Sequence, residues 1–306
     1  MRAMEPKLPD PRNEKIWIHV GGELLPREQA KVSVFDSSVQ GGDAVWEGLR
    51  VYGGRVFALE QHLERLETSA RALAFERIPP RAEIRRALFE TLAKNGMRDG
   101  AHVRLTLTRG KKVTSGMSPA FNQYGTTLIV LAEWKAPVYG SGGLTLISSA
   151  VRRAPPAVLD SKIHHNNLLH NILAKIEANI AGVEEAVMLN SEGFVAECTG
   201  DNIFGIRSAT KTIFTPSTNA GLLNGVTRRF VLETLAPALG YRTEERLFRM
   251  DELLKADEVF LTGSAAEIIG VSQIDTHVVG RGAVGPHTKA LVAEFRKRVA
   301  NNAPED

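Results

Sequence analysis

The first 135 residues change from a strand-like to a helix-like spacing of apolar side chains. Residues 15–58 carry short runs of β-branched and aromatic residues separated by glycine pairs, which predicts antiparallel strands joined by tight turns. The clearest turn is "YGGRVF" at 52–57, because glycine accepts the positive φ that such turns need. Residues 59–73 and 81–96 then space apolar side chains three or four apart, which predicts two helices, the second ending at Gly96.

The strand-like pattern returns after the helices, at 101–110 ("AHVRLTLTRG") and at 126–134 ("TTLIVLAEW"). The polar segment between these strands is longer than a tight turn and contains glycine. We therefore expect residues 111–125 to form a lid or a substrate loop.

A linker at 136–144 is indicated by proline and glycine without any hydrophobic period. It would separate an N-terminal domain, 1–135, from a C-terminal domain, 145–306. The second part mixes a meander of strands with helices at 167–182, 225–240 and 287–300, and shows no regular βαβ alternation. The predicted class is α+β with mixed sheets.

Composition narrows the possible functions. The 38 basic and 35 acidic side chains are interspersed along the chain, so charge indicates neither a nucleic-acid partner nor a membrane surface. The single cysteine, Cys198, excludes an internal disulfide and a thiolate cluster, and fits a reducing cytoplasm best. The longest apolar runs have the length of strands, and the polar N-terminus has no signal-peptide core, so we expect a cytoplasmic protein.

Histidines gather in "LDSKIHHNNLLHNILAKIEAN" at 159–179, which raises the question of a metal site. His164 and His165 are adjacent, so their rings diverge on a strand or a helix. No carboxylate or thiolate follows at a ligand spacing. We therefore predict no metal site in this stretch, which also contains Lys162.

Two glycine-containing segments could bind an anion through backbone N–H groups. "LLNGVTRRF" places Gly225, Val226 and Thr227 at the predicted start of a helix, where the dipole favours negative charge. "FLTGSAAEI" ends a strand at Thr262 and Gly263 with small hydroxyl-bearing residues. Taken alone, the first segment is better explained as an ordinary glycine-containing loop with Thr227 helping to cap the helix, and the second is equally well explained as a simple turn.

Two charged residues have similarly open interpretations. Arg65 in "HLERL" shares a helix face with His62 and could hold a phosphate with two hydrogen bonds, although surface arginines are commonly just solvated. Glu197 lies among small and apolar residues on a predicted strand. It is either solvated or buried beside a cation, and periodicity alone does not decide.

Taken together, these segments resemble the fold-type IV pyridoxal-phosphate enzymes, the class IV aminotransferases. The resemblance runs in order through "VWEGLRVY", "HLERLETSA", "ILAKIEAN", "EGFVAECTGDNIF", "LLNGVTR" and "FLTGSAAEI". It implies a fold similar to that of D-amino acid aminotransferase, with a smaller N-terminal α/β domain and a larger C-terminal pseudo-barrel domain of mixed sheet. It also implies pyridoxal 5'-phosphate as cofactor.

The resemblance assigns roles to individual residues. Lys162 would form the aldimine with the cofactor and then move the substrate proton, and Glu197 would keep the pyridine nitrogen protonated. The other implied cofactor contacts are Arg65, His164, Asn202, Leu223, Gly225, Val226, Thr227, Thr262 and Gly263. The implied substrate contacts are Trp46, Arg50, His102, Arg104, Ser264 and Ala265.

The register of the lysine is the least regular part of the resemblance. When "NILAKIEAN" is aligned with such enzymes, His164 falls at their usual lysine position and Lys162 precedes it by two residues. On an extended strand, residues two apart point the same way and lie roughly 7 Å apart, so a long side chain and a bulge could restore the geometry. We expect Lys162 to provide the amine and His164 to line the site.

The substrate remains open at this stage. "VWEGLRVY" and Arg104 are similar to the branched-chain type, which implies a branched-chain L-amino acid donor, 2-oxoglutarate as acceptor and a homodimer or higher homo-oligomer. Gly41, His102 and Asn167 or Leu168 stand where that type often has tyrosine. A D-amino acid or (R)-amine transaminase, an aminodeoxychorismate lyase and a non-catalytic cofactor-binding protein are the alternatives.

Overall fold

The computed structural model of the 306-residue chain describes residues 8, 10–137 and 142–301. Four of the nine residues of the proposed linker, 138–141, lie outside the described residues. The chain divides into two compact units. Unit 1 contains the described residues up to Ala136 together with His164–Asn167, and unit 2 contains Pro137–Ile163 and the described residues from Leu168 onward.

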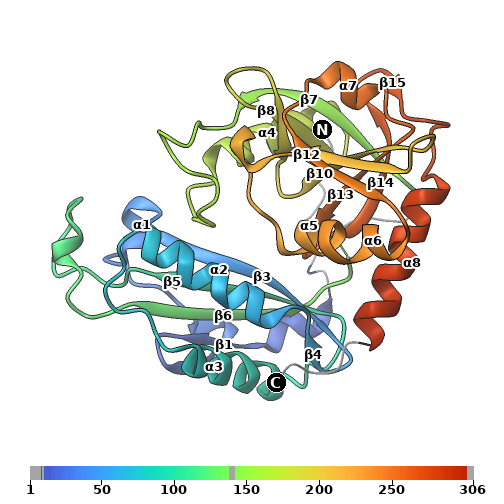
Figure 1. Ribbon diagram of the computed structural model, residues 1–306. Coiled ribbons are helices and arrows are strands. Elements are labelled where there is room, and N and C mark those ends of the chain that lie inside the picture. Colours follow the sequence, from blue (N-terminus) through green and yellow to red (C-terminus); the bar gives the residue numbers. More distant parts are fainter. Residues whose placement is uncertain (1–7, 9, 138–141, 302–306) are drawn as a thin grey trace. The chain divides into compact units, whose positions relative to one another are not determined.

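Unit 1 is built on a six-stranded antiparallel sheet with the order β2-β1-β6-β5-β3-β4 (Figure 1). Its strands are β1 (Trp17–Val20), β2 (Glu23–Pro26), β3 (Ala44–Tyr52), β4 (Arg55–Val56), β5 (Ala101–Thr108) and β6 (Thr127–Trp134). The turn expected at 52–57 is confirmed, since Tyr52 pairs with Arg55 around Gly53 and Gly54, whose φ angles are 55° and 85°.

Two helices cover parts of this sheet. α2 (Leu59–Ala72) lies against β3, and α3 (Arg81–Lys94) lies against β1 and β6 (Figure 1). Both helices bury their apolar faces, and Gly96 follows α3 with a φ of +66°, as predicted for a helix end. Unit 1 also has short helical segments: η1 (Pro11–Lys15), η2 (Arg27–Gln29), α1 (Ser37–Gly41) and η3 (Pro119–Phe121).

A short stretch from the second half of the sequence completes unit 1. The backbone N–H of Trp46 donates to the His164 carbonyl at 2.9 Å, and the N–H of Asn166 donates to the Ala44 carbonyl at 2.9 Å. His165 forms a β-bridge with Val45 between them. Residues 164–167 therefore extend the sheet beside the first half of β3, where β4 does not reach.

Unit 2 contains a nine-stranded mixed sheet with the order β12-β11-β10-β13-β14-β7-β8-β9, with β15 paired to β14. The sheet curls, because β9 at one end also lies against β10 and β11 near the other end. The strands are β7 (Leu144–Arg152), β8 (Glu185–Leu189), β9 (Val195–Cys198), β10 (Asn202–Arg207), β11 (Thr212–Pro216), β12 (Arg242–Arg246), β13 (Glu258–Gly263), β14 (Glu267–Ile274) and β15 (His277–Val278).

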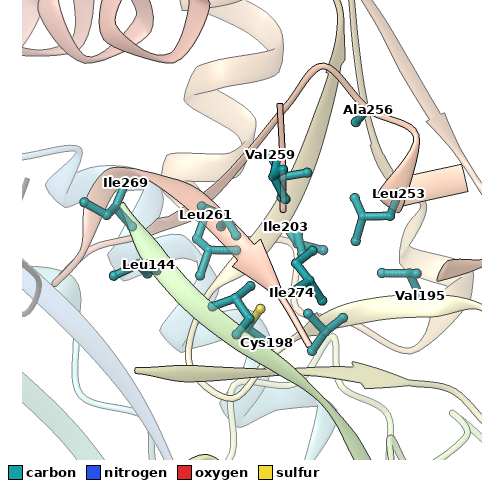
Figure 2. Close-up of a cluster of buried hydrophobic side chains, with 14 of the residues drawn as sticks. Leu144, Val195, Cys198, Ile203, Leu253, Ala256, Val259, Leu261, Ile269 and Ile274 are labelled. Carbon is teal, nitrogen blue, oxygen red and sulfur yellow. The ribbon is translucent and has the colours of Figure 1, made fainter. Parts of the chain in front are cut away.

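The curled sheet encloses an apolar core. Figure 2 shows part of this cluster, in which Leu144, Ile203, Leu261 and Ile274 are each at most 3% exposed. Cys198 belongs to the same cluster, and burial raises the pKa of its thiol well above the usual range. The cysteine is therefore an inert core residue.

The remaining helices of unit 2 are α4 (Leu169–Ala181), η4 (Thr218–Ala220), α5 (Val226–Phe230), α6 (Ala236–Ala238), α7 (Met250–Leu254) and α8 (Pro286–Asn301). The helix predicted at 225–240 contains a π-helical turn, η5 (Val231–Leu235), between α5 and α6. Pro237 follows this turn, and because proline lacks an N–H it is compatible with a widened turn rather than a regular ladder. The predicted α+β class with a pseudo-barrel is confirmed.

Candidate active site

A buried carboxylate organises one polar cluster in unit 1. Glu47 of β3 accepts two hydrogen bonds from Arg65 of α2, from Nε at 2.8 Å and from Nη2 at 2.6 Å. His62 Nδ1 lies 2.6 Å from the same carboxylate, and His164 Nδ1 lies 3.2 Å from it. The Glu47 side chain is 0% exposed, so these contacts replace its hydration.

The charge of this cluster follows from its contacts. Burial alone would raise the pKa of Glu47, but the Arg65 guanidinium and the histidine contacts outweigh it and hold that pKa well below the usual range. His62 therefore donates its Nδ1 hydrogen to an ionised carboxylate. His164 Nδ1 also lies 3.3 Å from Arg65, so one of its tautomers donates to Glu47 and the other accepts from Arg65.

The predicted substrate contacts of unit 1 share one face of the sheet. Trp46 and Arg50 alternate with Glu47 along β3, so they point to the opposite face. Arg50 lies directly opposite His102 of β5, and the Arg104 guanidinium lies 3.3 Å from the Trp46 ring centroid. Trp46 also contacts His164, with ring centroids 4.0 Å apart.

This face combines cationic groups with partial burial. Desolvation lowers the pKa of Arg104 to about 10, and desolvation with the nearby charges of Lys135, Arg50 and Arg104 lowers the pKa of His102 to about 4. His164 is also shifted to a pKa of about 4, first by burial and then by Arg65. Both histidines are neutral at pH 7, and the positive charge of the face comes from its arginines.

Because the pKa values of His102 and His164 are lowered, we expect the free energy of unfolding to decrease at acidic pH. Their folded pKa values of about 4 lie below the unfolded value near 6.5, so only the unfolded chain takes up these protons between those values. Stability falls as pH falls through that window, by on the order of 3 kcal/mol for each histidine. Urea unfolding at pH 7 and pH 4.5 measures the change. His102→Gln should reduce the loss of unfolding free energy between pH 7 and pH 4.5, while the same substitution at the exposed His277 should leave that loss unchanged. An equal loss in wild type and in His102→Gln would contradict the role of His102.

A second polar cluster lies in unit 2 around Arg153, which is 4% exposed. All five N–H groups of this guanidinium have partners within 3.1 Å. The acceptors are the Gly221 carbonyl, His170 Nε2, Asn171 Oδ1, Ser161 Oγ and Glu197 Oε1. Because His170 Nε2 accepts, its proton is on Nδ1 in the neutral ring.

Glu197 of β9 is thereby held in a fixed orientation. Its Oε1 lies 2.8 Å from Arg153, while Oε2 accepts from the Leu223 backbone N–H at 3.1 Å and from Asn202 Nδ2 at 3.2 Å. Asn202 also donates to the Leu223 carbonyl at 2.9 Å. The predicted residues Glu197, Asn202 and Leu223 are therefore in direct contact. Of the two interpretations left open for Glu197, solvated or buried beside a cation, the second is correct.

The predicted phosphate segments lie close to this cluster. Asn202 of β10 pairs in register with Thr262 of β13, and a Cβ on Gly225 would come within 2.2 Å of Asn202 Oδ1. Gly225 caps α5, so Val226 and Thr227 form its first turn, both at most 5% exposed. Among the described residues, Thr262 Oγ1 is a buried side-chain oxygen without a hydrogen-bond partner.

The adjoining residues Gly263, Ser264 and Ala265 are partly exposed. A Cβ on Gly263 would lie 2.1 Å from Asp201 Oδ1, so a side chain at this position would displace Asp201. Glycine here keeps the strand end close to the loop that follows Cys198.

Lys162 and His164 lie in different units. The Lys162 side chain is 56% exposed, and its Nζ is 3.6 Å from Asp160 Oδ2. Its neighbour Ser161 is 4% exposed and contacts Arg153, so the backbone of Lys162 is one residue away from the Glu197 cluster. His164 belongs to unit 1 and is committed to the Glu47 cluster.

Sequence reasoning did not identify Glu47, Arg153 or His170 as site residues. A signal existed for Glu47, because a single carboxylate inside the apolar strand "AVWEGLRVY" needs a cationic partner, and Arg65 had been noted beside His62. Arg153 has no comparable signal, since its partners come from five separate positions between 161 and 221.

The described residues contain no group of three or more histidine, cysteine or acidic side chains arranged to hold a metal ion. Within that same part of the chain, no helix is both long and apolar enough to cross a membrane.

Comparison with known proteins places the chain in a family. The family model described as "Amino-transferase class IV" matches residues 44–274, and this chain belongs to that family. "Branched-chain-amino-acid aminotransferase-like protein 2" of Arabidopsis thaliana is 55% identical over 293 residues, covering 95% of this chain and 52% of that protein. The chain thus spans about half the length of this relative.

Other relatives match over nearly their full length. The "Putative branched-chain-amino-acid aminotransferase" of Methanocaldococcus jannaschii is 39% identical, covering 91% of this chain and 95% of that protein. Among solved structures, the branched-chain amino acid aminotransferase of Thermobaculum terrenum "in PLP-form (holo-form)" superposes with a TM-score of 0.83. It is 29% identical, and the match covers 94% of this chain and 94% of the other.

Proposed function

We propose that this protein transfers an amino group from an amino acid to a 2-oxo acid such as 2-oxoglutarate, with pyridoxal 5'-phosphate as its cofactor. The observation that carries the proposal is the Glu197 cluster, a buried carboxylate oriented by Arg153, Asn202 and the Leu223 N–H in a class IV aminotransferase fold. Such a carboxylate suits a protonated pyridine nitrogen.

The residues of unit 2 fit this cofactor. The buried Thr262 Oγ1 lacks a hydrogen-bond partner, and a phosphate oxygen would satisfy it. Thr262 is joined through its strand partner Asn202 to Glu197, so a hydroxyl for the phosphate and a carboxylate for the ring nitrogen belong to one connected cluster. Gly225, Val226 and Thr227 at the start of α5 are the further candidates for phosphate contact.

When bound, pyridoxal 5'-phosphate supplies an aldehyde and an electron-withdrawing ring. Glu197, whose Oε1 lies 2.8 Å from the Arg153 guanidinium, would face the ring nitrogen as a carboxylate and would hold a proton on it. Lys162 Nζ is the proposed base that accepts and returns the substrate proton. Its side chain leaves Asp160 for this role, and an exposed ion pair of that kind contributes little to stability.

On the substrate side, we propose a branched-chain L-amino acid as donor. The face formed by Trp46, Arg50, His102 and Arg104 combines an aromatic surface with arginines, which suits a side chain with few polar atoms and a carboxylate. In unit 2, Ser264 and Ala265 remain candidate substrate contacts. Arg65 and His164 remain candidate cofactor contacts, although both are engaged with Glu47.

A second candidate is a cofactor-binding protein that does not catalyse transamination. It is favoured by one observation, that the Lys162 side chain is 56% exposed and contacts Asp160. The resemblance to class IV aminotransferases also implies that His164 falls at their usual lysine position. An imidazole cannot form an imine with an aldehyde.

The decisive assay combines a substrate panel with a spectrum. We expect purified protein incubated with pyridoxal 5'-phosphate to absorb in the visible range and to convert branched-chain L-amino acids with 2-oxoglutarate. Preferred conversion of D-amino acids or of (R)-amines would replace the substrate assignment, and release of pyruvate from aminodeoxychorismate would indicate the lyase. Binding without turnover of any donor would favour the second candidate.

We also propose that the protein forms a homodimer or a higher homo-oligomer. We propose the cytoplasm as its location, because the single cysteine, Cys198, is free and buried and a protein without disulfides suits a reducing compartment.

A further inference from the structure

A pocket of about 440 Å³ lies in unit 1, outside the polar clusters described above. We call it the Arg77 pocket. Its walls come from residues 74–77, which follow α2, from Arg109, and from residues within 119–126. Part of the loop predicted at 111–125 as a lid or substrate loop therefore belongs to it. None of the lining residues is a predicted site residue, and the volume is sufficient for a small molecule.

Two opposite charges on the walls of the Arg77 pocket are not neutralised by the protein. Arg77 is exposed, and its guanidinium makes one long hydrogen bond, from Nη1 to the Gln123 carbonyl at 3.4 Å. Glu76 is also exposed and forms no ion pair with any residue that the structure describes. Arg109, in contrast, is paired with Asp43 at 2.6 and 3.2 Å. A ligand with both a negative and a positive group would satisfy Arg77 and Glu76 together.

Asn122, which also lines the pocket, lacks a donor for its side-chain oxygen. Its Nδ2 donates to Ser37 Oγ at 2.8 Å and to the Gly110 carbonyl at 2.7 Å, and these two acceptors fix the orientation of the amide. Its Oδ1 is buried and has no hydrogen-bond partner within the described part of the chain. An ammonium group of a ligand would satisfy this oxygen.

The other walls of the Arg77 pocket are partly apolar. Ala74, Pro119 and Ala120 are exposed lining residues without polar side-chain atoms. Phe75 lies beneath them, 6% exposed, with the Arg109 guanidinium 4.4 Å from its ring centroid. Small-molecule sites typically combine apolar walls with a few polar groups that fix the orientation of the ligand. The walls therefore suit a zwitterion whose side chain has few polar atoms.

The pocket is connected by hydrogen bonds to both ends of α1. Asn122 donates to Ser37, the first residue of α1, and Arg109 donates to Asp43, two residues after the helix ends. Asp43 directly precedes β3, the strand that carries the candidate substrate face. A ligand that contacts Asn122 would therefore steady the α1 segment, residues 37–43.

We propose that the Arg77 pocket is a second binding site, which takes an α-amino acid with an apolar side chain and stabilises the α1 segment when it is filled. The ligand carboxylate pairs with Arg77, and the ammonium group donates to Glu76 and to Asn122 Oδ1. This site goes beyond the proposed amino transfer, because its lining residues take no part in that reaction. Binding is measured without cofactor, so its result is independent of the catalytic proposal.

The test is hydrogen–deuterium exchange of the full chain over a titration with L-leucine, which gives both the place and the affinity of binding. We expect slower exchange at 74–77, 119–126 and 37–43, with a Kd of about 1 mM or tighter. Two probes each lack one charged group: 4-methyl-2-oxopentanoate has no ammonium, and 3-methylbutylamine has no carboxylate. Each should bind at least about tenfold more weakly than leucine. Unchanged exchange at 74–77 and 119–126, or equal binding of either probe, overturns the proposal.

Variants of two lining residues separate this pocket from any other leucine site. Arg77→Gln should raise the Kd at least about tenfold, because the carboxylate loses its cation. Arg71→Gln is the matched control: Arg71 is an exposed arginine of α2 that pairs with Glu67 and does not line the pocket, so the Kd should not change. Ala120→Trp fills the pocket from an exposed position and should abolish the slower exchange, which decides the matter even if Arg77→Gln fails to fold. Wild-type affinity in Arg77→Gln or in Ala120→Trp overturns the proposal.

Discussion

Lys162→Ala is expected to lower amino-transfer activity by at least 10²- to 10⁴-fold, the usual contribution of a positioned acid–base group. The fold should be nearly unaffected, because the lysine side chain is 56% exposed and its contact with Asp160 is a surface ion pair worth at most about 1 kcal/mol. Steady-state turnover of the best donor, together with urea unfolding, separates the two effects. Borohydride treatment of the loaded wild type should fix the cofactor to residue 162, located by peptide mapping.

Lys255→Ala is the matched control for this variant. Lys255 lies in the same unit, is exposed, and forms an ion pair with Asp251 at 3.5 Å, compared with 3.6 Å for Lys162 and Asp160. It should retain wild-type activity. Full activity in Lys162→Ala, or a borohydride label on another lysine, would refute the assignment of Lys162. A bound cofactor with no label at all would instead support the non-catalytic alternative.

Arg153→Met is expected to destabilise the protein by roughly 3–5 kcal/mol, because it leaves Glu197 buried without its cation. His170, Asn171, Ser161 and the Gly221 carbonyl lose donors at the same time. Arg153→Lys should recover only part of this loss, since an ammonium has three donors and lacks the planar fork. The free energy of unfolding in urea is the measurement.

Arg152→Met provides the neighbouring control. Arg152 precedes Arg153 in the chain, is exposed, and donates to the Ser149 and Ala150 carbonyls, so its loss should change stability by about 0.5 kcal/mol or less. The double variant Arg153→Met/Glu197→Gln removes both charges and should be more stable than Arg153→Met alone. If the double variant is no more stable than Arg153→Met, the destabilisation comes from lost packing around Arg153 and not from the unpaired charge of Glu197.

Local sequence patterns were sufficient to predict most helices and strands of the fold. The helices at 59–73 and 81–96 and the turn at 52–57 were predictable, because their residues interact with neighbours three or four positions away or within one turn. The π-helical turn at Val231–Leu235 could not be predicted from the sequence. It changes the pattern of backbone hydrogen bonds, while the spacing of apolar side chains stays close to that of an α-helix.

The candidate site was predictable only in part. Glu197, Asn202 and Leu223 were expected together, and they are in contact. The Arg153 cluster was missed because no periodicity links positions 153, 161, 170 and 221, which meet only through the curled sheet of unit 2. The pairing of Glu47 with Arg65 depends on how α2 lies over β3, which no local pattern expresses.

The four-residue stretch His164–Asn167 has a consequence for how the chain tolerates division. It occupies the edge of β3 at Ala44–Trp46, which would otherwise present unpaired N–H and C=O groups beside apolar residues that are almost fully buried. A fragment that ends at Ala136 would keep the sheet but lose this cover. Such a bare strand edge is a template for intermolecular pairing, so a fragment that ends at Ala136 is a poor choice for separate expression. Unit 1 is complete only when the chain returns to it at His164–Asn167.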